Sequence, residues 1–190
     1  MSHIDPYLDP ASGVLQNKFG VTNQPTFDRI EREWVVQRIV EGAPSGDFDL
    51  DHLRAIHRHL FQDIFAWAGE IRTVELVKNG DQFQPKAFIM NGMADVHARL
   101  KQQKYLSGLK RDDFAEGAAR IIGDVNYVHP FREGNGRAQL QYLQQLAERA
   151  GHPLDISAFK DDWITASRAS HQGDYSLMAA AIGGAILVRS

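Results

Sequence analysis

The segment YVHPFREGNGRAQLQYLQQL, residues 127–146, leads from a charged, glycine-containing stretch into a helical pattern. Its middle part, HPFREGNGR (residues 129–137), brings a histidine, a carboxylate, glycines and arginines together. Proline disfavours the helical conformation for the residue before it, so the preceding helix should end close to His129. The next helix should begin near Gly136 and continue over residues 138–150. The segment therefore predicts a tight turn between two helices, with several chemically active side chains on it.

The glycines of this turn predict an anion site. Gly134 and Gly136 permit backbone conformations that point several N–H groups into one concavity. The helix that follows adds its own free N–H groups and the positive end of its dipole. Asn135 offers a side-chain amide, and Arg137 offers a charge-assisted fork in the first helical turn. Phosphate is the usual occupant of such a site, although a glycine-rich turn between helices is also common without any ligand.

The two remaining polar groups indicate a reaction class. Glu133 does not suit a phosphate site unless a divalent cation such as Mg²⁺ lies between the two. His129 is the ready base near neutral pH. Together they predict transfer of a phosphorus-containing group to a hydroxyl, with the histidine taking the hydroxyl proton. The lysine that follows the glycines in a P-loop is absent from this pattern, so a P-loop NTPase is not expected.

The rest of the chain is predominantly helical in pattern. A cap at Thr26 predicts a helix that ends at Gly42, and a second helix should end at Gly69. Residues 72–77 are β-branched and roughly alternating, and a turn at residues 79–81 follows, which predicts one hairpin. One hairpin cannot form a sheet domain, so the expected fold is an all-α single domain of about seven helices. The predicted helices cover residues 27–42, 50–69, 87–106, 111–128, 138–150, 155–170 and 174–188.

Composition limits the function further. The 190 residues carry a net charge of −3 and no cysteine, so a disulfide framework and thiolate chemistry are excluded. Such a charge provides no overall attraction for nucleic acid or an anionic membrane, and neither is expected as a direct partner. The first residues lack a signal-peptide pattern, and the apolar segment 177–188 is too short to span a bilayer. We expect a cytoplasmic protein.

At this point the motif resembles a known family. HPFREGNGR is similar to the Fic signature HxFx(D/E)GNGRxxR through its first nine positions. Residues 53–85 resemble the helix and flap that precede this motif in Fic domains, residues 5–20 resemble the arm of short bacterial members, and residues 173–178 resemble their final segment. The resemblance implies one Fic-type helical domain over residues 1–190. Its parts would be an N-terminal arm (1–25), a β-hairpin flap (71–85) and an active-site loop with the helix start (129–140).

The resemblance implies an activity and residue roles. Most Fic enzymes transfer AMP from ATP to a hydroxyl of a target protein. His129 would be the general base, and Glu133 would hold Mg²⁺ against the nucleotide phosphates. Phosphate contacts are implied for Gly134, Asn135, Gly136 and Arg137, with Phe131 as an apolar anchor.

A further role is implied for the flap. It would pair with the backbone of the target through Val74, Glu75, Leu76 and Val77, and Lys78 and Asn79 would touch the nucleotide. The alternative is a solvated surface ribbon.

Two departures from the family pattern bear on activity and regulation. The last arginine of the motif is Leu140 here, so a phosphate contact is missing unless Arg132 or Arg168 replaces it. The inhibitory pattern (S/T)xxxE(G/N) fails at Glu41, where Gln37 stands four residues earlier. This resembles the class that is inhibited by a small separate antitoxin, and it implies the toxin of a bacterial toxin–antitoxin pair. DNA gyrase and topoisomerase IV are the targets expected from the family.

Two alternatives to AMP transfer stay open. A catalytically degenerate Fic module would only bind a nucleotide or a partner protein. In the second alternative, the chain is a Fic enzyme that transfers a phosphorus-containing group other than AMP.

Several other residues are weighed against simpler explanations. His52, His57 and His59 do not converge at the spacing of a zinc site, so a mostly solvated helix face is favoured. The three tryptophans are expected in the core. By resemblance, an adenine wall is expected around Asp174 and Tyr175, and His171 is expected at the surface.

Overall fold

The computed structural model describes residues 5–78, 80–159 and 161–187. In this part of the chain seven α-helices and a two-stranded hairpin are present, so the predicted mostly helical fold is confirmed. The helices are α1 (Gln24–Glu41), α2 (Leu50–Phe61), α3 (Ile89–Gln102), α4 (Arg111–Val128), α5 (Asn135–Ala150), α6 (Asp161–His171) and α7 (Ser176–Ala185). The hairpin strands are β1 (Val77–Lys78) and β2 (Asp81–Gln82), and short 3₁₀ turns lie at Lys86–Phe88, Lys104–Leu106 and Ile156–Ala158.

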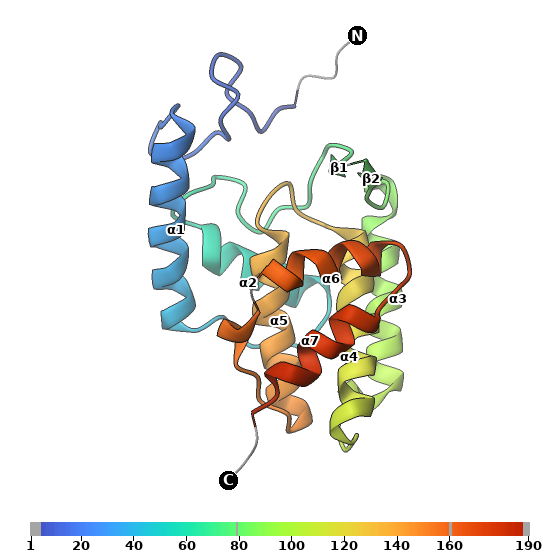
Figure 1. The fold of residues 1–190 in the computed structure, drawn as a ribbon. Helices are drawn as coiled ribbons and strands as arrows, with labels where there is room; N and C mark the ends of the chain where they lie inside the picture. The colour runs from blue at the N-terminus through green and yellow to red at the C-terminus, as the bar shows by residue number, and fades with distance from the viewer. Residues whose placement is uncertain (1–4, 79, 160, 188–190) are drawn as a thin grey trace.

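Helix α4 forms the centre of the bundle, where α3, α5, α6 and α7 all pack against it. Helix α2 lies between α5 and the outer helix α1 (Figure 1). The apolar positions spaced three and four apart on these helices are the ones that become buried. Among the fully buried side chains are Leu53, Ile56 and Leu60 of α2, Ile122 and Val125 of α4, and Tyr142, Leu143 and Leu146 of α5.

Several predicted helix boundaries are wrong. Helix α3 ends at Gln102 rather than at residue 106, and α6 begins at Asp161 rather than at residue 155. Helix α1 is capped by Asn23, whose side chain accepts the backbone N–H of Thr26, and Thr26 itself lies inside the helix. Helix α2 ends at Phe61 rather than at Gly69. Beyond it, the carbonyls of Gln62 and Ile64 accept hydrogen bonds from Lys18 of the N-terminal arm. These contacts join residues that are distant in sequence, and a local pattern does not contain them.

The predicted strand over residues 72–77 is also wrong, since only Val77 and Lys78 are in strand β1. Val77 pairs with Gln82, and Lys78 pairs with Asp81. The preceding backbone groups bond elsewhere. The N–H of Arg72 donates to the carbonyl of Pro130, and that of Thr73 to the hydroxyl of Tyr7.

The α4–α5 connection follows the prediction. Helix α4 ends at Val128, and His129 leaves it in the left-handed conformation, with φ 47° and ψ 63°. Helix α5 starts at Asn135, three residues before the predicted range. The loop between them, residues 129–134, is called the motif loop below. It lies at the same end of the bundle as the hairpin and the N-terminal arm (Figure 1). Across the described residues, each helix is too short or too polar to cross a membrane.

Candidate active site

Side chains from three parts of the chain hold the motif loop in place. The amide of Asn135 closes it from within, because its oxygen accepts the N–H of Phe131 at 2.9 Å and its nitrogen donates to the Phe131 carbonyl at 2.7 Å. Phe131 is fully buried, which confirms its predicted role as an apolar anchor. From α2, His57 stacks on Phe131 with ring centroids 3.9 Å apart. These contacts hold the motif loop in its observed conformation.

His57 was expected on a mostly solvated helix face, and this prediction is wrong. Its ring is fully buried, and Nδ1 accepts the N–H of Gly69 at 2.9 Å. The other nitrogen, Nε2, must then carry the proton, and it donates to the carbonyl of Glu133 at 2.9 Å. Burial lowers the pKa of His57 to about 4, so the ring is neutral near pH 7. His57 thus supports the motif loop as a neutral hydrogen-bonding residue.

Gly134 is required by both conformation and space. Its φ of +82° is left-handed, and a Cβ there would lie 2.4 Å from Cζ of Phe61 and 3.2 Å from Nε2 of His57. Gly136 is different, because a Cβ at this position would meet nothing within 4 Å. The N–H groups of the first turn of α5 have no earlier carbonyl in the helix to bond, so they are available to an anion.

The imidazole of His129 is held in one tautomer. Nδ1 lies 3.1 Å from the carbonyl of Asn126, so it carries the proton and donates it. Nε2 is then the nitrogen with the lone pair. One face of the ring is covered by Phe83, with centroids 3.8 Å apart. Burial, helped by the positive charges of Lys78 and Arg72, lowers the pKa of His129 to about 3, so the ring is neutral at physiological pH.

A cavity of about 440 Å³ opens beside His129. It lies between the motif loop, the hairpin and α6. Three cations and two carboxylates line it, a balance that suits an anionic ligand. The lining residues are Leu76, Val77, Lys78, Asp81 and Phe83 of the flap, Asn126, His129, Arg132, Glu133, Asn135, Gly136 and Gln139 around the motif loop, and Trp163, Ile164, Ser167, Arg168 and His171 of α6.

Most of the residues predicted for the site meet at this cavity. It is lined by Leu76, Val77, Lys78, His129, Glu133, Asn135 and Gly136. Four others do not line it: Val74, Glu75, Gly134 and Arg137. Asn79 lies outside the described residues. Because the amide of Asn135 is occupied by Phe131, the groups that remain to meet an anion at this turn are the backbone N–H groups.

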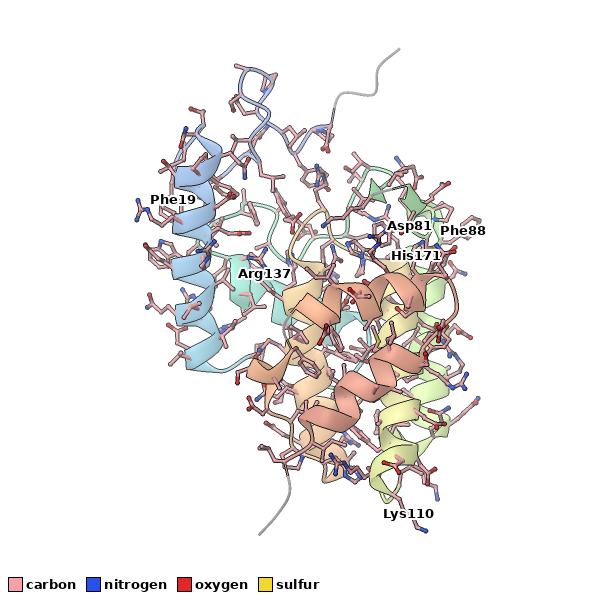
Figure 2. The ribbon with its side chains drawn as sticks, viewed as in Figure 1. Phe19, Asp81, Phe88, Lys110, Arg137 and His171 are labelled. Atoms are coloured by element: carbon pink, nitrogen blue, oxygen red, sulfur yellow. The ribbon has the colours of Figure 1, made fainter. Side chains whose placement is uncertain are left out.

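Arg137 points away from the cavity toward α1 (Figure 2). Its guanidinium pairs with Glu31 of α1 at 2.9 Å and lies 4.8 Å above the ring of Phe61. A second carboxylate, that of Glu133, is 3.7 Å away. In this structure the arginine therefore ties α1 to the start of α5. A phosphate contact from Arg137 would require it to leave Glu31.

Glu133 is the carboxylate that suits a divalent cation. The described residues contain no group of three or more histidine, aspartate or glutamate side chains arranged around a metal site. Mg²⁺ in nucleotide sites is commonly held by one or two carboxylates together with water and substrate phosphates. One oxygen of Glu133 accepts the N–H of Gly134 at 2.9 Å, and the side chain lines the cavity. This donor set fits a magnesium ion carried by a nucleotide.

Sequence reasoning missed several cavity residues. Gln139 is 2% exposed and its Nε2 has no hydrogen-bond partner among the described residues, and the same holds for Nε1 of the buried Trp163. His171 was predicted at the surface, but it is half-buried, lines the cavity and packs edge-on against Phe83, so that prediction is wrong. Tyr175 is absent from the cavity lining, because its hydroxyl donates to Asp124. Only the spatial approach of α6 to the hairpin brings these groups together.

The sequence of this chain is similar to those of known proteins. A family model described as Fic/DOC family matches residues 47–147. "Protein adenylyltransferase VbhT" of Bartonella schoenbuchensis is 37% identical over 182 residues, which cover 94% of this chain and 38% of that protein. The chain thus spans well under half the length of this relative. "Probable protein adenylyltransferase y4lH" of Sinorhizobium fredii is 36% identical over 180 residues, which cover 94% of each chain.

Solved structures share the fold over nearly the whole chain. The crystal structure of BepC from Bartonella tribocorum, a VirB-translocated effector with bound AMPPNP, superimposes with a TM-score of 0.87 at 26% identity and covers 97% of each chain. The N-terminal Fic domain of a Bep effector from Bartonella quintana, with bound ADP, gives a TM-score of 0.86 at 27% identity. It covers 94% of this chain and 93% of that one.

Proposed function

The chain belongs to the Fic/DOC family, and on that premise we propose that it transfers AMP from ATP to a hydroxyl side chain of a target protein. Relatives named protein adenylyltransferase align with 94% of its length. The observation that carries the proposal is the state of His129 beside the cavity. Its Nδ1–H is committed to the Asn126 carbonyl, and Nε2 keeps its lone pair at neutral pH.

The reaction proposed for this site has one proton transfer and one displacement at phosphorus. The hydroxyl oxygen of the target attacks the α-phosphorus of ATP and forms the new O–P bond, while Nε2 of His129 accepts the hydroxyl proton. The bond from the α-phosphorus to the bridging oxygen breaks, and pyrophosphate leaves. Lys78, Arg168 and the start of α5 line the cavity, and the two cations and the backbone N–H groups there are proposed to stabilise the charge on the phosphates.

Mg²⁺ is proposed as the cofactor, with Glu133 as its protein ligand. When bound, the ion neutralises phosphate charge and fixes the orientation of the polyphosphate. Glu133 is then needed for transfer more than for folding, since its contacts are local: one oxygen accepts the N–H of Gly134 and lies 3.7 Å from the guanidinium of Arg137. A Glu133→Gln variant is expected to fold and to need more Mg²⁺ for the same rate.

The hairpin is proposed as the docking site for the target. Each strand of a two-stranded sheet has an open edge that a further strand can join. Val77 and Lys78 form β1, Leu76 precedes it, and all three line the cavity, so a strand added there would run past His129. Docking of this kind delivers a target hydroxyl to the base.

Transfer is tested by incubating the chain with ATP labelled on the α-phosphate and a bacterial lysate. We expect labelled protein bands with the wild type and none with His129→Ala. Mass spectrometry of a labelled band must then give the mass of AMP. If another phosphorus-containing group is found, the nucleotide specificity is wrong. If neither variant labels anything while ATP still binds, the chain is a binding module.

For its biology we propose the toxin of a bacterial toxin–antitoxin pair. The absence of an intact (S/T)xxxE(G/N) pattern supports inhibition by a separate small protein. DNA gyrase and topoisomerase IV are proposed as targets from the family resemblance. Expression of the active chain alone should arrest growth, and a small protein encoded beside it should relieve the arrest. Harmless expression of active protein would contradict this proposal.

A further inference from the structure

Arg72 lies where the flap meets the motif loop. Its side chain is fully buried. The guanidinium donates from Nε to the carbonyl of His129 at 2.8 Å and from Nη1 to that of Val74 at 2.7 Å. Its Nη2 donates to the carbonyls of Gln84 and Val128. Four main-chain carbonyls thus converge on one guanidinium.

These carbonyls come from two separate segments. Val128 and His129 form the end of α4, where carbonyls have no helical partner and the helix dipole is negative. Val74 and Gln84 stand on the two arms of the flap, before β1 and after β2. The Arg72 guanidinium therefore supplies hydrogen bonds to the free carbonyls at the end of α4, and it also joins the two arms of the flap.

The backbone N–H of Arg72 adds a third link. It donates to the carbonyl of Pro130 at 2.9 Å, so one residue bonds to both His129 and the residue after it. His129 has a left-handed φ of 47°, which is uncommon for a residue other than glycine. A residue held in such a conformation needs support from its surroundings. Arg72 supplies much of that support.

We propose that Arg72 is a positioning residue that couples the target-docking flap to the general base. The inference rests on the proposed function and adds a means of control to it. A target strand that orders the flap also orders Arg72, and through Arg72 the main chain of His129. A loose flap releases the same carbonyls and lets the imidazole leave its place beside the cavity. Docking and proton removal are thereby linked through one side chain.

Only arginine meets the geometry. Its planar group carries five N–H donors spread over three nitrogens, whereas lysine carries three donors on one nitrogen. A lysine at this position keeps the charge but cannot reach carbonyls on both sides. The nearest carboxylate, that of Glu75, is 3.7 Å away and half exposed, so carbonyls rather than a close ion pair hold the charge.

The first test separates positioning from folding. We compare Arg72→Lys with the wild type and with Arg111→Lys as the matched control. Arg111 also donates to a main-chain carbonyl, that of Gly183, but at the other end of α4. We expect Arg72→Lys to lower kcat by about 10²-fold, in line with the effect of a small misplacement of a catalytic group. The KM for ATP should change less than about threefold, because Arg72 does not line the cavity.

A second variant guards against simple misfolding. Arg72→Ala leaves a space that ethylguanidinium fills, because this cation has the same atoms as the part of the side chain that alanine lacks. Adding it should restore at least a tenth of the lost kcat. Ethylammonium, with the wrong donor geometry, should restore none. The proposal is overturned if Arg72→Lys retains the wild-type kcat, or if kcat and ATP affinity fall together without rescue.

A third readout does not depend on AMP transfer. The amides of Phe83 and Gln84 bond to the carbonyls of Leu76 and Tyr127, so they report on the flap. In Arg72→Lys they should exchange hydrogen at least tenfold faster, and the His129 imidazole should titrate at a higher pH. The charged or titratable groups that act on this ring are Lys78, Arg72 and His171. If the wild type transfers no AMP, the proposed function fails. Separately, if amide exchange and the titration of His129 are unchanged in Arg72→Lys, the coupling between flap and base is overturned.

Discussion

The ring of His129 lies against the ring of Phe83, with centroids 3.8 Å apart and an angle of 21° between the planes. Phe83 is buried and follows strand β2, so the flap itself covers the imidazole. This stacking keeps water from one face of the ring and contributes to the burial that lowers the pKa of His129. The flap thus contributes to the burial that keeps the base neutral.

Replacing Phe83 should shift the pH dependence of transfer. In the wild type the pKa of His129 is about 3, so the base is neutral throughout the range from pH 5 to pH 8 and its protonation does not limit the rate there. Phe83→Ala admits water, and the pKa of His129 should rise toward about 6.5. The variant should then lose activity as the pH falls through about 6, because the imidazolium cannot accept a proton. NMR titration of the imidazole measures this directly.

The control for this prediction is Phe88→Ala. Phe88 is 56% exposed on the 3₁₀ turn after the flap, so its loss should leave the titration of His129 unchanged. An unaltered pKa in Phe83→Ala would show that other groups keep the ring neutral.

The two glycines of the motif should respond differently to alanine. Gly134→Ala places a Cβ 2.4 Å from Phe61 in a left-handed conformation, and it should lower the free energy of unfolding by about 2–4 kcal/mol. Gly136→Ala meets open space in the first turn of α5, so stability should stay equal or rise by about 0.5–1 kcal/mol. Its methyl group lies beside the cavity, however, and ATP affinity should fall at least tenfold.

Urea denaturation and ATP titration measure the two effects separately. Each variant serves as the control of the other, since one glycine is needed for the fold and the other for ligand access. Equal loss of stability in both variants would contradict the distinction.

Much of this site can be predicted from the sequence, because its main residues are adjacent along the chain. Pro130 ends α4 and the glycines start α5, so His129 and Glu133 had to lie at the same turn. Arg72 could not be assigned in this way. A lone arginine in a β-branched run looks like an exposed strand residue, and its four carbonyl partners come from residues that become neighbours only after folding.

The end of α2 and the role of His57 escaped prediction for the same reason. Just after the end of α2, the carbonyl of Gln62 accepts a hydrogen bond from Lys18, 44 residues earlier in the chain. His57 bonds to Glu133, 76 residues later. Helical periodicity identifies a buried stripe, but it cannot tell which polar residue on that stripe will find partners from distant segments.

His57 should make the fold sensitive to mild acid. Its pKa is about 4 in the folded chain and about 6.5 when unfolded, so the unfolded state binds more protons between these values. The stability that neutral His57 contributes is therefore fully present above about pH 6.5. It is lost as the pH falls to about 4, which lowers the free energy of unfolding by roughly 1–3 kcal/mol. His57→Gln keeps an amide near Glu133 but cannot titrate. Its free energy of unfolding should fall less steeply between pH 7 and pH 4.

Urea denaturation across this pH range measures the slope. The pKa of His129 is also lowered in the folded chain, to about 3, so this residue too destabilises the fold as the pH falls. Part of the acid sensitivity should therefore remain in the variant. His152→Gln is the control, because His152 is only half-buried, lies far from the motif loop just beyond the end of α5, and bonds through Nε2 to the carbonyl of Leu109. A wild-type slope in His57→Gln would contradict the prediction.

The loss of the last arginine of the motif makes Arg168 the next cation to test. Leu140 is half-buried against the core and does not line the cavity. Arg168 lines it from α6, and none of the ion pairs among the described residues includes it. A charge-assisted hydrogen bond contributes about 1.5–3 kcal/mol, so Arg168→Gln should weaken ATP binding by roughly 10–100-fold. Adenosine has no phosphate and should bind with nearly unchanged affinity.

A second substitution tests whether position 140 can take over this role. Residues 136 and 140 lie one turn apart on the same face of α5, so an arginine placed at 140 can reach the phosphates beside Gly136. Leu140→Arg in the Arg168→Gln background should therefore restore most of the lost ATP affinity without altering that for adenosine. Arg111→Gln is the control, because Arg111 lies at the start of α4 and does not line the cavity. It should change the affinity for neither ATP nor adenosine. Calorimetric titration gives all these values, and an equal loss for ATP and adenosine in Arg168→Gln would mean that this arginine contacts the nucleoside instead.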